Sequence, residues 1–411
     1  GLGDVYKRQT PVELRDTVRD AALTWNIAFE EAGFSNAIEV RVQPDDADWD
    51  AGDIRYNVLR WTSSPTPPFG GYGPSFTHPR TGEIMGADIM LEYVFLTNRI
   101  RYSELFDVAG LSQWLPAEQL AEMTGEPVVE HDHSAHGAMC NFAEHLQMET
   151  MAGLATLQAQ GATTVEIDEL IRQSLHYLVI HEIGHTLGLM HNFAASTNDR
   201  ASVMDYPAPL IRFDNDTGFD ASQAYDVGIG EWDIASIAWL YSQYPDDAAE
   251  EAGLAAILAQ AQADGLLYIS DRHARGNASA HPFANLWDNG ADPTAMLRET
   301  LVVRDAALSR FGTDVMAQDL PLSEIRNVFP PIYLYHRYQV EAAAKALGGV
   351  MFAYEVNGPE VDGVNDFDPD RQREALNALV ETLEPSRLDI SDATLRLLTP
   401  SPYTDYDPIA R

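Results

Sequence analysis

Apolar positions in the first part of the chain follow a helical rhythm and then a strand rhythm. In residues 11–34 they recur three or four positions apart, which is typical of a helix that packs on one face. Residues 38–42 alternate apolar and polar side chains, and residues 53–61 also have strand character. Residues 75–78 and 83–91 flank a Pro-Arg-Thr-Gly turn, so we expect them to pair as a hairpin.

Helical periodicity dominates the rest of the chain. Residues 166–189 carry the strongest helical pattern, and residues 141–160 are also predicted to be helical. Beyond residue 228 one helical segment follows another, without a period that would indicate a solenoid. These segments are residues 231–244, 247–263, 293–311, 325–346, 368–383 and 391–398.

The change from a mixed pattern to a helical one predicts a domain boundary near residue 220. We expect residues 10–220 to form an α/β domain and residues 221–411 a mostly α-helical C-terminal domain. Residues 112–140 are acidic, contain several histidines and are weakly periodic, so we interpret them as an insertion. Residues 1–9 lack an initiating methionine and fit neither a targeting segment nor the rhythm of residues 11–34. We interpret them as an extraneous, non-native segment that replaces the true N-terminus.

The chemistry is concentrated in the segment His-Glu-Ile-Gly-His-Thr-Leu-Gly-Leu-Met-His, residues 181–191. His181 and His185 lie four residues apart and so share one face of a helix. Gly188 can adopt the left-handed conformation that ends a helix, which lets the chain turn back and present His191. Three imidazoles around one zinc ion leave a fourth position open, as in catalytic rather than structural zinc sites.

Glu182 stands beside this predicted site and suits the role of general base. Zinc lowers the pKa of a bound water from 15.7 toward about 7, and a carboxylate can then accept its proton during attack on a peptide carbonyl. A short His-Glu-x-x-His motif also arises by chance on ordinary helices. The added Gly188 and His191 make chance the poorer explanation, so the sequence predicts a zinc-dependent metalloendopeptidase.

The extended motif HExxHxxGxxH resembles the signature of the metzincin clan. That resemblance implies a zincin catalytic domain with a twisted mixed sheet and an active-site helix, and it requires a Met-turn downstream. Residues 202–206 provide one, and by resemblance Met204 would form an apolar floor beneath the zinc. Tyr206 stands where some metzincins place a tyrosine, either as an extra metal ligand or as a stabiliser of the oxyanion. Residues 87–91 resemble the edge strand that binds an extended polypeptide substrate, although a plain solvent-facing edge is the alternative.

Within the clan, the chain resembles large bacterial zinc-dependent metalloproteases with an EcxA-like zinc-binding domain. The segments that carry this resemblance are residues 53–61, 72–91, 181–193, 202–207 and 371–399. The group implies an export signal and a further N-terminal domain, so we expect a secreted or periplasmic protein. Two departures are expected: the first strand before the residue 11–34 helix is absent, and residues 112–140 are inserted.

Composition restricts the partners of the protein. The 411 residues carry a formal net charge of −37, which repels nucleic acid and anionic membranes, so neither is expected as a main partner. The acidity suits cationic or unfolded polypeptides, but solubility in a salty habitat is the interpretation we favour. No apolar run approaches the roughly 18–20 residues of a membrane span. The single cysteine, Cys140, allows no intrachain disulfide.

Two further segments resemble metal-binding sequences. Residues 131–136 contain three histidines, but a solvated acidic loop is the favoured interpretation. Residues 214–220 offer oxygen donors with calcium-like spacing, yet the glycine offset differs from that of an EF-hand and a surface turn is favoured. Calcium is therefore a secondary candidate beside one catalytic zinc ion.

Two other functions remain open at this stage. The chain could be a catalytically silent, zinc-stabilised binding module whose helical domain recruits a partner. Glu182 argues against that alternative, because a structural zinc site does not need a carboxylate there. A specialised aminopeptidase would need a group that captures the amino terminus of its substrate, and we identify none in the sequence.

Overall fold

The computed structural model describes most of the chain outside two long gaps. The described residues are 2–6, 10–62, 71–92, 164–275, 279–316, 320–357 and 362–400, with separate helical residues between 146 and 158. The predicted insertion at residues 112–140, the histidines of residues 131–136 and Cys140 lie outside this set. None of the helices in the described part combines the length and the apolar character that a membrane crossing requires.

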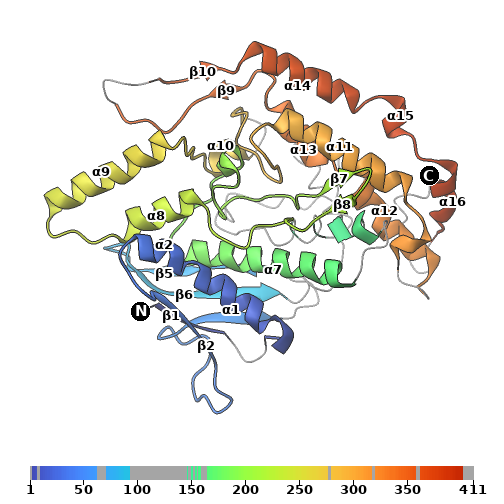
Figure 1. Cartoon of the computed structure of the whole chain (residues 1–411). Coiled ribbons are helices and arrows are strands. Elements are labelled where there is room, and N and C mark those ends of the chain that lie inside the picture. The colour runs from blue at the N-terminus through green and yellow to red at the C-terminus, as the bar shows by residue number, and fades with distance from the viewer. Residues whose placement is uncertain are drawn as a thin grey trace, which may run out of the picture.

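A twisted mixed sheet forms the N-terminal part of the molecule (Figure 1). Its strands are β1 (Leu2–Tyr6), β2 (Ile38–Val42), β3 (Asn57–Thr62), β4 (Gly71–Tyr72), β5 (Ser75–Thr77) and β6 (Ile84–Glu92). The order is β2-β1-β3-β6-β4. Strand β5 also pairs directly with β6, at residues that precede those paired with β4. Strands β1, β2, β3 and β6 run parallel, whereas β4 and β5 are antiparallel to β6. The predicted hairpin is therefore present as β5 and β6.

The expectation that no strand precedes the first helix is wrong. Strand β1 lies inside the sheet, with Leu2 opposite Ile38 of β2 and Asp4 opposite Asn57 of β3. Residues 2–6 supply backbone groups to two neighbours at once, so they fill the position of a central strand. That residues 1–9 are extraneous in origin stays a prediction.

The edge of the sheet is also not where the sequence predicted it. Strand β6, which contains residues 87–91, pairs on its far side with β4 through Gly71 and Leu91 and with β5 through Ser75 and Ala87. Strand β4, which lies just before the hairpin, and strand β5 of the hairpin itself together cover the edge that was expected to be free. Among the described residues no strand pairs with the outer side of β4 and β5, so residues 71–77 are the edge segment.

Within the described part of the chain, three helices pack against the sheet, and the last of them carries the first two histidines. They are α1 (Arg15–Thr24), α2 (Asn26–Glu31) and α7 (Thr164–Thr186). The helix predicted for residues 11–34 is divided at Trp25, whose ring is fully buried and whose Nε1 donates a hydrogen bond to the carbonyl of Ile180 at 3.0 Å. This contact fixes α1 and α2 against the C-terminal half of α7, directly before His181.

The C-terminal region is mostly helical, and Figure 1 shows its later helices on the side of α7 away from the sheet. Its helices are α8 (Glu231–Tyr241), α9 (Asp247–Ala263), α10 (Asp271–Ala274), α11 (Pro293–Ser309), α12 (Ile325–Tyr333), α13 (Arg337–Ala344), α14 (Pro369–Glu381), α15 (Pro385–Leu388) and α16 (Asp392–Leu397). Two short hairpins accompany them, β7 (Arg212–Asp214) with β8 (Gly218–Asp220) and β9 (Val350–Met351) with β10 (Asn365–Asp366). Helices α11 and α14 each begin with a proline preceded by an aspartate that caps the helix.

One apolar core runs through both predicted domains. The same buried cluster includes Val18 of α1, Leu178 of α7, Ile237 of α8 and Tyr338 of α13. The burial of these side chains stabilises the two regions together, since removing apolar surface from water is the main favourable contribution to folding. The division at residue 220 stays a prediction, but the C-terminal helices lie close enough to contribute to the site.

Candidate metal centre

The end of α7 positions the first two histidines and redirects the chain. Gly188 has φ of 96°, a left-handed conformation that suits glycine. The amide of Gly188 donates to the carbonyl of His185 and the amide of Leu189 to that of Gly184, each at 3.0 Å. This pair of hydrogen bonds is the Schellman arrangement that ends a helix. Helix α7 therefore ends at Thr186, one residue after His185, and the chain returns toward the same face.

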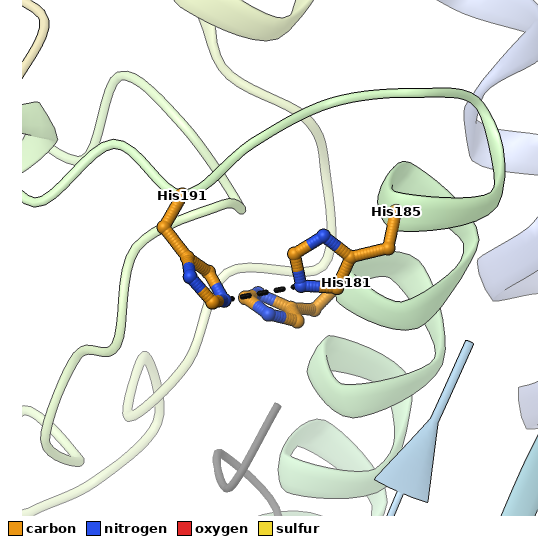
Figure 2. Close-up of side chains that lie close together, drawn as sticks. All are labelled: His181, His185 and His191. Atoms are coloured by element: carbon orange, nitrogen blue, oxygen red, sulfur yellow. Dashed lines mark hydrogen bonds between the residues drawn. The ribbon is translucent and has the colours of Figure 1, made fainter. Parts of the chain in front are cut away.

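The structure brings His181, His185 and His191 together, as Figure 2 shows. One ring nitrogen of each lies within 4.8 Å of the others, and the Nε2 atoms of His185 and His191 are 3.1 Å apart. A tetrahedral zinc with bonds of roughly 2.0–2.1 Å would hold two ligand nitrogens about 3.3 Å apart. The three imidazoles thus fit a zinc ion with little rearrangement.

Backbone carbonyls orient the two histidines on the helix. Nδ1 of His181 lies 2.6 Å from the carbonyl oxygen of Val203, and Nδ1 of His185 lies 3.0 Å from that of Leu189. A carbonyl oxygen can only accept, so each Nδ1 carries the proton. Each Nε2 then keeps its lone pair for a metal.

The third histidine has a charged partner that sequence reasoning did not identify. Nδ1 of His191 lies 2.9 Å and 3.1 Å from the two carboxylate oxygens of Asp271, the first residue of α10. Asp271 is 80 residues downstream, and no local motif marks it. Burial alone would raise the pKa of Asp271, but the hydrogen bonds and charges of His191 and Arg275 outweigh it and hold that pKa below its ordinary value.

Burial keeps all three imidazoles neutral. It lowers the pKa of His181 well below 6.5 and that of His185 to about 3, and neighbouring imidazoles add to both shifts. The pKa of His191 is also lowered, because burial outweighs the opposing effect of Asp271. A neutral imidazole is the form that binds a metal ion, so the protein environment favours the binding state near neutral pH.

Glu182 is fully buried beside this cluster and lies against the edge segment. A β-carbon added to Gly73, between β4 and β5, would be 2.5 Å from the backbone oxygen of Glu182 and 3.2 Å from its Oε2. Any residue larger than glycine would therefore push the edge segment away from α7. The structure thus places the predicted general base next to the edge of the sheet.

Met204 lies beneath the helix that carries the histidines. Its side chain is fully buried, and a β-carbon at Gly184 would lie 2.3 Å from its Sδ. Asp233 of α8 fixes the backbone around it by accepting hydrogen bonds from Ser202 Oγ at 2.6 Å and from the amides of Val203 and Gly230 at 2.8 Å. Neither Gly184 nor Asp233 was singled out from the sequence, because their roles depend on contacts across the fold.

Tyr206 is fully buried next to the third histidine. Its ring centre is 4.8 Å from that of His191 and 5.2 Å from that of Trp287, and its backbone oxygen accepts a hydrogen bond from the Trp287 amide at 2.6 Å. These contacts place Tyr206 at the site. Its predicted role, either as an extra ligand or as a stabiliser of the oxyanion, stays a prediction.

Residues 214–220 form the turn between β7 and β8 together with strand β8. The Asp214 carboxylate accepts hydrogen bonds from the amides of Asp216 and Thr217, and Gly218 has φ of 86°. This is the surface turn that the residue types favoured, with the Asp214 side chain used to close it.

Comparison with known proteins gives one finding. A family model described as Met-zincin matches residues 163–410, which include the three histidines and the whole C-terminal helical region. No curated protein and no solved structure matches the chain. The finer resemblance to proteases with an EcxA-like domain stays a prediction.

Proposed function

Since this chain belongs to the Met-zincin family of zinc metalloproteases, we propose that it is an endopeptidase in which Glu182 is the general base. The observation that carries this proposal is the position of Glu182, fully buried and adjacent in α7 to a three-histidine cluster that fits zinc. A structural zinc site would not require a buried carboxylate at that point.

Different residues of the chain would have different roles in peptide hydrolysis. His181, His185 and His191 would hold the zinc ion, which when bound supplies Lewis acidity toward a peptide carbonyl and activates water at neutral pH. Glu182 accepts a proton from the attacking water and passes it to the leaving amine. Tyr206 is close enough to the cluster to assist the developing oxyanion.

The edge segment at residues 71–77 is the place where we expect extended polypeptide to bind. It has no strand partner on its outer side among the described residues, and Gly73 brings it against Glu182. A substrate strand paired there would gain main-chain hydrogen bonds with little demand on its sequence. The scissile bond would then lie beside the general base.

We also propose that the protein is secreted or periplasmic, because the group that it resembles is exported. Fractionation of cells that produce the natural gene product tests this proposal. Recovery of the protein only from the cytosolic fraction would contradict it.

Replacement of Glu182 tests the proposed chemistry. Loss of general base catalysis typically costs about 10²–10⁴-fold in rate, so Glu182→Gln should reduce cleavage of casein and of a quenched peptide library by at least about 100-fold. Zinc content per chain should stay that of the wild type, because Glu182 is not a predicted ligand. His185→Ala is the matched variant, which should lose both zinc and activity.

Unchanged cleavage by the Glu182→Gln protein would refute the mechanism. If wild-type protein binds one zinc per chain but cleaves no peptide in the library, the catalytically silent binding module becomes the better explanation. The zinc and cleavage measurements together therefore distinguish the two functions.

A further inference from the structure

We propose that Asp271 is a positioning residue that orients His191 toward the metal, which makes the C-terminal helical region part of the zinc site. This inference rests on the proposed function, and it assigns to a residue 80 positions downstream a role in metal binding.

His191 needs such a partner more than the other two histidines. His181 and His185 are fixed by α7, whereas His191 comes after the turn at Gly188 and lies outside the helix. Its Nδ1 donates to the Asp271 carboxylate, which leaves Nε2 available and fixes the plane of the ring. A carboxylate behind a ligating histidine also raises the basicity of the ligand.

The backbone around Asp271 is tied to the backbone around His191. The amide of Phe193 donates to the carbonyl of Ile269 at 3.0 Å, and the side chain of Asn192 bonds both Leu267 and Ile269. These contacts hold residues 267–269 alongside the segment that directly follows His191. Asp271 is thereby brought to the ring by main-chain pairing and not only by its own side chain.

Arg275 holds the carboxylate in place from the other end of α10. Its Nε donates to Oδ1 of Asp271 at 2.8 Å. The guanidinium lies 5.1 Å from the ring centre of Phe193 and 5.0 Å from that of Tyr206. Cation–π contact with two buried rings restricts Arg275, so Asp271 is held between the histidine and a fixed cation.

Helix α10 is in turn anchored to the C-terminal helices. Lys345, the residue directly after α13, is half-buried and donates to the carbonyls of Ala274 and Ala284 at 2.7 Å each. The first of these carbonyls belongs to the last residue of α10. The contacts therefore run without interruption from α13 through α10 and Asp271 to His191.

The test measures zinc affinity in the full-length chain by competition with a chromogenic chelator at one fixed pH. Loss of such a supporting group typically weakens metal binding about 10–100-fold, so Asp271→Ala should raise the dissociation constant by that factor. Asp271→Asn keeps an oxygen that can accept a hydrogen bond from Nδ1 of His191. Its zinc affinity should therefore lie between that of the wild type and that of Asp271→Ala. Asp264→Ala removes an exposed carboxylate at the end of α9 and should bind zinc like the wild type.

Thermal melting of the metal-free variants separates positioning from a merely structural role. We expect zinc affinity to decrease from the wild type to Asp271→Asn and then to Asp271→Ala. The melting temperatures of the metal-free proteins should not follow this order. Zinc affinity of Asp271→Ala within twofold of the wild type would overturn it, as would an affinity loss that only tracks metal-free stability. If Asp271→Ala does not fold, the Asn variant decides by the same criterion. Zinc affinity needs no substrate, so absence of peptidase activity would refute the proposed function and leave this inference standing.

Discussion

The Sδ of Met204 lies so close to Gly184 that a β-carbon at this glycine would be 2.3 Å from the sulfur. Gly184 sits inside α7, between the histidines of the metal cluster, where glycine is normally a poor helix residue. The missing side chain is what allows the methionine to pack directly beneath the helix. The ring of Trp25 closes the same space, with Cζ2 3.0 Å from the added carbon.

Gly184→Ala should therefore destabilise the protein, although alanine is intrinsically about 1 kcal/mol better in a helix. Extra volume in a packed core typically costs about 1–3 kcal/mol, and here the neighbours are buried and cannot move aside freely. We expect a lower free energy of unfolding in urea and weaker zinc binding. The measurement is chemical denaturation of the metal-free and zinc-loaded forms.

Met204→Ala provides the control through a double-mutant cycle. If the clash with Sδ is the cause, Gly184→Ala should cost less in the Met204→Ala background than in the wild type. Equal costs in both backgrounds would show that Met204 and Gly184 are not coupled.

The sequence predicted the parts of the site that depend on local geometry. Helical spacing is enough to place His181 and His185 on one face, and a glycine after them is enough to indicate the turn at Gly188. The hairpin of β5 and β6 was predictable for the same reason, because its turn residues lie between the two strands. Each of these signals involves residues fewer than about ten positions apart.

The features that the sequence did not reveal depend on long-range pairing. Strand β1 could not be predicted from its own residues, because its place is set by hydrogen bonds to β2 and β3 on either side. The first half of the edge segment was missed because β4 is only two residues long, whereas β5 was predicted as part of the hairpin. Asp271 carries no motif, and only the pairing of residues 267–269 with the segment after His191 brings it to the site.

His176 on α7 should make stability depend on pH. It is 4% exposed, and burial together with the charge of Arg172 lowers its pKa from 6.5 to about 4. Between these values the unfolded chain binds more protons than the folded one, so the free energy of unfolding falls as pH drops from about 6.5 to about 4. His176→Leu should remove this contribution, on the order of 3 kcal/mol between pH 7 and pH 4.

Urea denaturation of both proteins at a series of pH values measures the effect. Other buried histidines contribute equally to the two proteins, so the difference between their curves isolates His176. If that difference is constant between pH 7 and pH 4, the folded-state pKa of His176 is not depressed.

Gly73→Ala should impair catalysis more than stability, because the added carbon would meet the backbone oxygen of Glu182 at 2.5 Å. The edge segment would have to move away from α7, and a displacement of about 1 Å near reacting groups can cost on the order of 100-fold in rate. We expect a loss in kcat/KM of at least about tenfold with zinc affinity unchanged. Gly86→Ala in β6 is the matched control: its β-carbon would lie 3.4 Å from the nearest atom outside its chain neighbours, the backbone oxygen of Ile54, so cleavage should stay intact. Equal activity in the Gly73 and Gly86 variants would mean that substrate does not bind along residues 71–77, and that the catalytic step does not need the contact between this segment and Glu182.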